Sequence, residues 1–127
     1  MTRMLAVLFI AVVLLTPGLA RGVEQVDFEV DTARNLFNLC TVTSSDPLYK
    51  EAINFCHGYL VGAYDYYKAA TIGPGGKRLV CPPDPAPSRN DSINMFIEWL
   101  KVHPQYMGDE AVDTEFRFLM EKWPCKP

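Results

Sequence analysis

The cysteines constrain what this chain can fold into more than any other feature of the sequence. Four of them occur in 127 residues, at Cys40, Cys56, Cys81 and Cys125. An even number of cysteines in a short exported chain is typical of a disulfide framework. Four cysteines allow three pairings; we favour Cys40–Cys56 with Cys81–Cys125, and the other two pairings stay open. Because the chain lacks Cys-x-x-Cys and a histidine at ligand spacing, we predict no zinc site and no other cofactor.

Residues 1–20 have the pattern of a secretory signal peptide. Arg3 supplies the positive charge, Leu5–Leu15 is an unbroken apolar run, and Gly18-Leu19-Ala20 offers the small residues of a cleavage site. This apolar run is too short to cross a bilayer, which takes about 20 residues. We therefore expect cleavage after Ala20, a mature domain of residues 21–127, and no membrane attachment after cleavage.

Composition and charge exclude two classes of protein. The chain has 12 basic and 15 acidic residues, and removal of residues 1–20 takes away only Arg3, which leaves a net charge of −4. A nucleic-acid binder normally carries a basic patch or a basic balance, so we expect no nucleic-acid partner. Intrinsic disorder is also excluded, because 49% of the residues are hydrophobic.

Four helices and no convincing strand are predicted for the mature chain. Residues 21–30 alternate weakly and are expected to form an extended arm. Each predicted helix is preceded by a side chain that can cap it. With their caps, the helices are expected to run from Asp31 to Cys40, from Asp46 to Ala70, from Ser88 to His103 and from Asp109 to Pro124. The fold class is therefore all-α: a small four-helix domain with a long central helix, stapled by two disulfides.

Apolar spacing predicts the buried face of each helix. In the second helix the apolar stripe is wide, so we expect cover on more than one side. Gly58 and Gly62 share one face of that helix, where another helix could approach closely. The expected inner residues are Ile93, Phe96, Ile97 and Leu100 in the third helix, and Val112, Phe116, Leu119, Met120 and Trp123 in the fourth.

The second helix also carries a familiar motif. The segment Cys56–Asp65, which reads CHGYLVGAYD, is similar to the C-x-G-Y-[IL]-x-G-x-x-D motif of the Rap/Tai family of immunity proteins. The likeness continues from Leu36 to Cys125. It includes Cys81-Pro82, the helix end from Trp99-Leu100 to His103-Pro104, Ala111 and the closing Trp123-Pro124-Cys125.

This resemblance implies a fold and a function. Members of the family are small all-α proteins of the periplasm, frequently homodimers, without enzymatic activity. They protect bacteria by occluding the active-site cleft of a peptidoglycan amidase delivered by type VI secretion. For this chain the resemblance implies a cognate amidase effector as partner, toxin neutralisation as function and a homodimer as its form.

Three places in the chain are candidates for contact with that partner. Asp65 matches the acid of the family motif, although it could instead bond to Lys68, Arg78 or a nearby turn. The stiff Pro-rich segment 82–87 suits insertion into a cleft, because it loses little entropy on docking. The connection between the last two helices is expected to expose acidic and aromatic side chains that suit a basic partner. The candidate residues are Asp65, Pro83, Asp84, Tyr106, Asp109 and Glu110.

Two other functions fit parts of the pattern. A periplasmic acid-stress chaperone of the HdeA type is also small, helical and disulfide-bonded, but usually has two cysteines. A secreted hydrolase would need a nucleophile and a base, and the chain offers only His57 and His103 as imidazoles. We therefore predict a binding protein without catalytic residues.

Overall fold

The computed structural model describes residues 21–127, so the predicted signal peptide lies outside the described residues. Its four α-helices confirm the all-α prediction, and no strand occurs between residues 21 and 127. In chain order the helices are the 3₁₀-helix η1 (Gln25–Glu29), α1 (Ala33–Cys40), α2 (Tyr49–Thr71), α3 (Arg89–Val102), the 3₁₀-helix η2 (Pro104–Tyr106) and α4 (Ala111–Lys122).

The two disulfides have the favoured pairing. Cys40–Cys56 joins α1 to α2 with Cα atoms 5.2 Å apart, and Cys81–Cys125 joins the segment before α3 to the chain end with Cα atoms 4.9 Å apart. The first bridge requires α1 to cross α2 away from the short connection between them. The second ties together two segments that lie 44 residues apart in the sequence.

The core is centred on α1, which contacts η1 and each of the other three α-helices. Leu36 and Leu39 of α1 are fully buried. The expected inner face of α3 is confirmed, because all four of its predicted residues are buried. Phe96 of α3 packs at an angle against Phe118 of α4, with ring centroids 5.6 Å apart.

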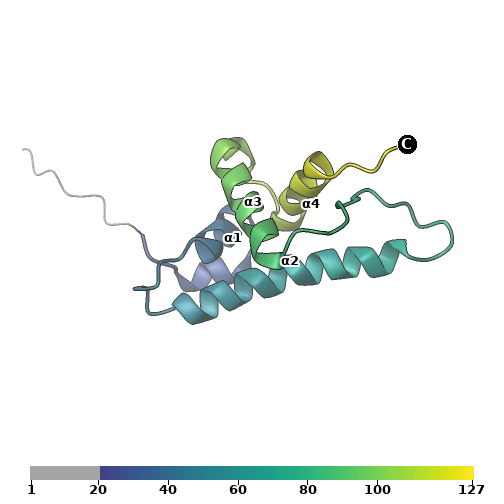
Figure 1. The fold of residues 1–127 in the computed structure, drawn as a ribbon. Coiled ribbons are helices and arrows are strands. Elements are labelled where there is room, and N and C mark those ends of the chain that lie inside the picture. Colours follow the sequence, from purple (N-terminus) through teal and green to yellow (C-terminus); the bar gives the residue numbers. More distant parts are fainter. Residues whose placement is uncertain (1–20) are drawn as a thin grey trace, which may run out of the picture.

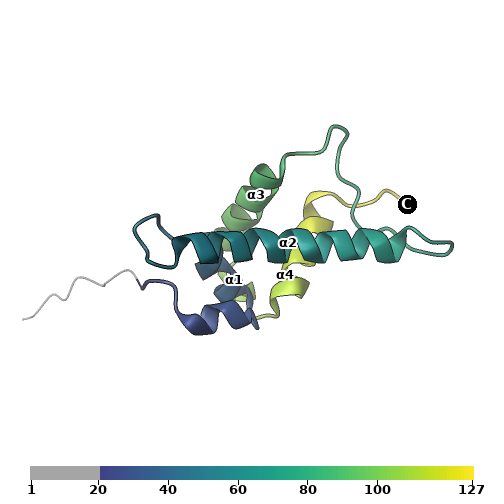
Figure 2. The same cartoon turned by 90° about the horizontal axis from the view of Figure 1, so that it is seen from below.

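Helix α2 is long, as predicted, but only one of its faces is covered. Helices α1, α3 and α4 all lie on the same side of it, and its C-terminal end extends past them (Figures 1 and 2). Its buried residues are Ala52, Cys56 and Leu60, whereas Tyr66 is 77% exposed. Apart from the backbone of α2 itself, no atom lies within 4 Å of a Cβ built at Gly58 or Gly62. The expectation of cover on more than one side is therefore wrong, because α1, α3 and α4 all pack on the same side of α2.

The N-terminal arm is also not extended. Residues 25–29 form η1, which the buried carboxylate of Asp27 holds against α1. This carboxylate accepts hydrogen bonds from the backbone N–H of Glu24 at 2.9 Å and from the side-chain amides of Asn38 at 3.0 Å and Asn35 at 3.3 Å. The weak alternation of residues 21–30 did not reveal this polar anchor.

Three of the four predicted caps differ in detail. Helix α1 is capped by Thr32 in place of Asp31, and α4 is preceded by Glu110, which makes no side-chain cap bond, in place of Asp109. Asp46 accepts a hydrogen bond from the backbone N–H of Leu48 at 2.8 Å, but α2 itself begins at Tyr49. The fourth is confirmed: Ser88 Oγ accepts from the N–H of Asp91 at 3.2 Å.

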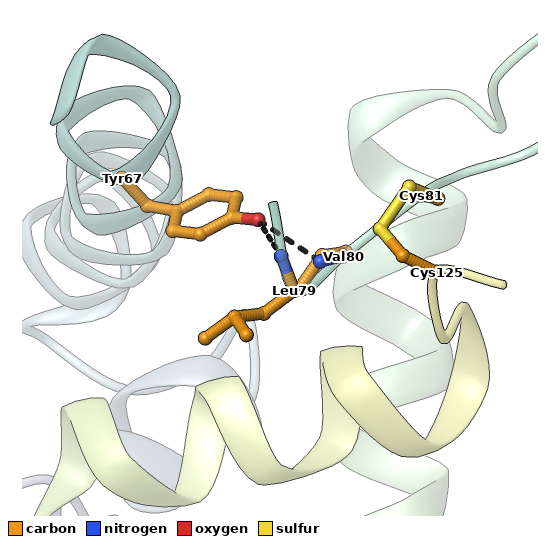
Figure 3. Close-up of a disulfide and its surroundings, with 5 residues drawn as sticks. All are labelled: Tyr67, Leu79, Val80, Cys81 and Cys125. Carbon is orange, nitrogen blue, oxygen red and sulfur yellow. Dashed lines mark hydrogen bonds between the residues drawn. A yellow bond between two sulfur atoms is a disulfide. The ribbon is translucent and has the colours of Figure 1, made fainter. Parts of the chain in front are cut away.

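The projecting end of α2 is tied back to the body by one tyrosine. The hydroxyl of Tyr67 accepts hydrogen bonds from the backbone N–H groups of Leu79 at 2.6 Å and Val80 at 2.9 Å (Figure 3). Val80 is 1% exposed, and Cys81 beside it enters the second disulfide. Tyr67 thus sets the path by which the chain reaches the Pro-rich segment 82–87.

We expect the substitution Tyr67→Phe to lower the free energy of unfolding by about 1–3 kcal/mol. The substitution leaves the buried N–H of Val80 without an acceptor, and an unsatisfied buried donor costs about that much. Urea denaturation of the mature protein measures the change. Tyr66→Phe is the matched control, since Tyr66 is exposed and a surface change costs less than about 0.5 kcal/mol. Equal stabilities of the two variants would contradict the anchor.

Candidate partner-binding site

All the predicted contact residues except Asp65 lie at two separate places around α3. Pro83 and Asp84 are exposed in the irregular segment that precedes α3. Asp109 and Glu110 are exposed in the connection that follows it. The 14 residues of α3 separate the two places by about 20 Å. A single partner that contacts both must therefore extend along α3.

Asp65 lies on the exposed surface of α2 and has a local partner. One of its carboxylate oxygens lies 2.7 Å from Nζ of Lys68, three residues further along the helix. The side chain also remains open to solvent. The local interpretation of Asp65 as a helix residue bonded to Lys68 thus agrees with the structure, and its role toward a partner stays a prediction.

Tyr106 is less exposed than predicted. Its ring is half-buried and lies parallel to the ring of Trp99, with centroids 5.4 Å apart, while the guanidinium of Arg117 covers it at 4.6 Å. His103 stacks on Trp99 as well, with centroids 4.3 Å apart. Tyr106 therefore stabilises the connection after α3 and offers a partner only part of its ring.

A pocket of about 220 Å³ lies between α2, α3, α4 and the Pro-rich segment. Its walls are mainly apolar, and they include one acidic side chain, Glu115, and one basic side chain, Arg89. Arg89 is exposed at the start of α3. The apolar and aromatic lining includes Leu60, Tyr64, Phe96, Phe118, Leu119 and Trp123. No pattern in the sequence indicated this pocket.

Glu115 is the most unusual ionisable group of the described chain. It is 4% exposed, and its Oε2 has no hydrogen-bond partner in the described part of the chain. Burial raises the pKa of Glu115 to about 8. Asp27 is equally buried, and burial alone would raise its pKa too, but the hydrogen bonds from Glu24, Asn38 and Asn35 lower it overall. Both carboxylate oxygens of Asp27 thus accept hydrogen bonds, whereas Oε2 of Glu115 accepts none.

The position of Glu115 explains why periodicity missed it. The predicted inner face of the fourth helix included Val112 and Met120, but these are 38% and 39% exposed. The face that is buried in α4 consists of Ala111, Thr114, Glu115, Phe118 and Leu119. Leu119 is buried as predicted, and Phe116 and Trp123 pack half-buried against the core, so the prediction was wrong for Val112 and Met120. It missed the two buried polar residues because apolar spacing counts only apolar side chains.

The two histidines lie on different elements of the fold. His57 lies on α2, and Nδ1 of His103 lies 2.8 Å from the backbone oxygen of Trp99, four residues earlier. All four cysteines are bonded in disulfides. Within residues 21–127, no group of histidine, cysteine, aspartate and glutamate side chains is placed to hold a metal ion. Of the helices in this range, none is long and apolar enough to span a membrane.

Comparison with known protein families gives a match. The model of the Rap1a immunity proteins matches residues 32–125, which include all four cysteines and the lining of the pocket. The chain belongs to the Rap1a immunity protein family. This confirms the resemblance seen in the sequence. No curated protein and no solved structure matches the chain. As a Rap1a immunity protein, it is expected to act on a cognate effector.

Proposed function

We propose that this chain is a periplasmic immunity protein that binds and occludes a peptidoglycan amidase delivered by type VI secretion. The observation that carries the proposal is the family match over residues 32–125. The protein would act by binding alone, without catalysis. Its own periplasm would be the place of action, since that is where a delivered amidase meets its substrate.

Two features of the molecule support this proposal. Two disulfides suit an oxidising compartment such as the periplasm and are rare in the cytosol. The acidic side chains at both ends of α3, namely Asp84, Asp109 and Glu110, are exposed. An acidic surface accelerates encounter with a basic partner and excludes partners of like charge.

Capture of the effector tests the function directly. The mature protein, tagged and exported in its own cells at neutral pH, is expected to retain one small secreted amidase in stoichiometric amount and to inhibit its hydrolysis of peptidoglycan. Light scattering of the purified complex is expected to give two copies of each protein, as the predicted homodimer requires. A deletion strain should become sensitive to its siblings.

Charge reversal tests the predicted contact residues. We expect Asp84→Lys and Glu110→Lys each to weaken binding of the effector at least tenfold, because like charges placed opposite each other at an interface cost several kcal/mol. Glu121→Lys is the control, since Glu121 is an exposed acid near the other end of α4. Equal affinities of all three variants, measured by calorimetry, would contradict the assignment of these residues.

The acid-stress chaperone is distinguished by a second arm of the capture experiment. A chaperone would bind no stable partner at neutral pH and many proteins after a shift to about pH 2–3. The family match favours the immunity role over this alternative. Protection of many unrelated proteins at acid pH, without a neutral-pH partner, would overturn the proposed function.

A further inference from the structure

We propose that the pocket beside Glu115 receives a lysine or arginine side chain of the bound effector, whose cationic end pairs with the Glu115 carboxylate. This inference rests on the proposed function, because it names the chemistry of the group that the partner inserts. The pocket lies between α2, α3 and α4. It would be a contact site in addition to the exposed acidic residues Asp84, Asp109 and Glu110.

The size and walls of the pocket suit one inserted side chain. Pockets for drug-sized ligands measure about 300–1,000 Å³, whereas this one measures about 220 Å³. Lysine and arginine have apolar stems that pack against apolar surface while the charged end seeks a polar partner. Leu60, Phe96 and Phe118 offer such a surface. Side chains that anchor an interface commonly fill a desolvated pocket of this kind.

Glu115 supplies the charge complementarity. A carboxyl that is 4% exposed, with Oε2 unpaired, lowers the stability of the free protein, so packing alone does not explain its presence. Side chains that break a folding rule are expected at functional sites. A cation within the pocket would supply the missing partner and regain interaction energy in a site with little water.

The other charged group on the pocket favours a cation over an anion. Arg89 is exposed, so solvent already satisfies its guanidinium and an anion would gain little from it. Glu115 has no such compensation. Because Arg89 repels an incoming cation, its removal is expected to strengthen binding of the cation, whereas the same change would weaken binding of an anion.

The location of the pocket agrees with the proposed interface. Pro82, Ala86 and Pro87 form part of its wall, and the predicted contact residues Pro83 and Asp84 lie between them in the sequence. A partner that docks on this Pro-rich segment is therefore next to the pocket.

Binding of a cation requires Glu115 to lose its proton. The carboxylic O–H breaks, the proton goes to solvent, and the carboxylate pairs with the ammonium or guanidinium of the partner. The titratable and charged groups around Glu115 are Tyr59 and Tyr64 of α2, Arg89 of α3 and Glu110 just before α4. Burial and the charges of Glu115 and Glu110 raise the pKa of Tyr59, so it keeps its proton well above pH 8. We therefore expect affinity to rise between pH 6.5 and 8.5.

Small side-chain analogues test the chemistry without the effector. The probes are n-butylammonium for lysine, n-propylguanidinium for arginine, and n-butanol and butanoate as neutral and anionic controls. Amide chemical shifts of ¹⁵N-labelled mature protein at pH 8.5 report binding at Leu60, Val61 and Ile93, which line the pocket. We expect the two cations to bind at least tenfold more tightly than butanol, Glu115→Gln to abolish this preference, and Arg89→Gln to increase it. Equal binding of butanol, or loss of binding with Arg89→Gln, would overturn the proposal.

The effector tests the assigned occupant. We expect Glu115→Gln to weaken capture at least tenfold and to remove its pH dependence, whereas Glu121→Gln, an exposed change on the same helix, leaves both unchanged. If the wild type captures an amidase and Glu115→Gln binds it equally well, the inference fails while the proposed function stands. If no amidase is captured at all, the proposed function fails, and with it the occupant named here, even where the cationic probes bind.

Discussion

Reduction of both disulfides is expected to unfold the mature domain at neutral pH. The bridges close loops with sequence separations of 16 and 44 residues. On the chain-entropy model such loops contribute roughly 3 and 4 kcal/mol, respectively. A small domain has a net stability of about 5–15 kcal/mol, so the loss of both bridges removes much or all of it. Far-UV circular dichroism and thermal melting, with and without a phosphine reductant, measure the effect.

Exposure also predicts the order in which the bridges are reduced. Cys56 is fully buried and Cys40 nearly so, whereas Cys81 and Cys125 are only half-buried. We therefore expect Cys81–Cys125 to be reduced first, because exchange requires access to the sulfur. Mass spectrometry after alkylation identifies the free cysteines. A reduced protein that keeps its native spectrum and unfolds with nearly unchanged free energy would contradict the structural role of the bridges.

A buried glutamate is expected to make the protein less stable as the pH rises. In the unfolded chain Glu115 has its ordinary pKa near 4.5, whereas burial raises the pKa in the folded state to about 8. Between these values the unfolded state has released the proton and the folded state still holds it, so the free energy of unfolding falls with increasing pH. At about 1.4 kcal/mol per pH unit, the total loss through this group is about 4–5 kcal/mol.

The substitution Glu115→Gln removes this titration. We expect its free energy of unfolding to change far less between pH 5 and 8 than that of the wild type, and the variant to be the more stable at pH 8. Urea denaturation at several pH values measures both slopes, with Glu121→Gln as the exposed control. Asp27 acts in the opposite direction: its pKa is lowered from 3.8, so its contribution is lost only in more acidic solution. Parallel slopes for Glu115→Gln and wild type would show that Glu115 is ionised in the fold.

This stability cost bears on the function. A neutral leucine or glutamine at position 115 would make a more stable protein in the unbound state, since a buried acid without a partner is destabilising. The same carboxyl becomes favourable once a cation enters the pocket. Binding of the effector is then expected to stabilise the folded immunity protein most strongly at pH 8, where the unpaired acid costs most.

Several features of the molecule were encoded locally and could be predicted. The four α-helices follow from apolar spacing between capping and breaking residues, which act over a few positions of the chain. The apolar residues of α3 form one narrow stripe, which consists of Ile93, Phe96, Ile97 and Leu100. A narrow stripe determines which face of a helix is buried in the core. The favoured cysteine pairing is confirmed, although the sequence left the other two pairings open, and the family motif in Cys56–Asp65 indicated the immunity family.

What only the tertiary structure decided is which side of the less regular helices is covered. Helix α2 has apolar residues around much of its circumference, so its sequence is compatible with several packings. The disulfide Cys40–Cys56 fixes where α1 crosses α2, and this crossing selects one of them. In α4 the buried face includes Thr114 and Glu115, which apolar spacing counts as outward. The pocket arises where α2, α3, α4 and the Pro-rich segment come together. No local pattern contains it, because its walls come from residues distant in the sequence. The raised pKa of Glu115 in its wall results from burial that only the whole fold imposes.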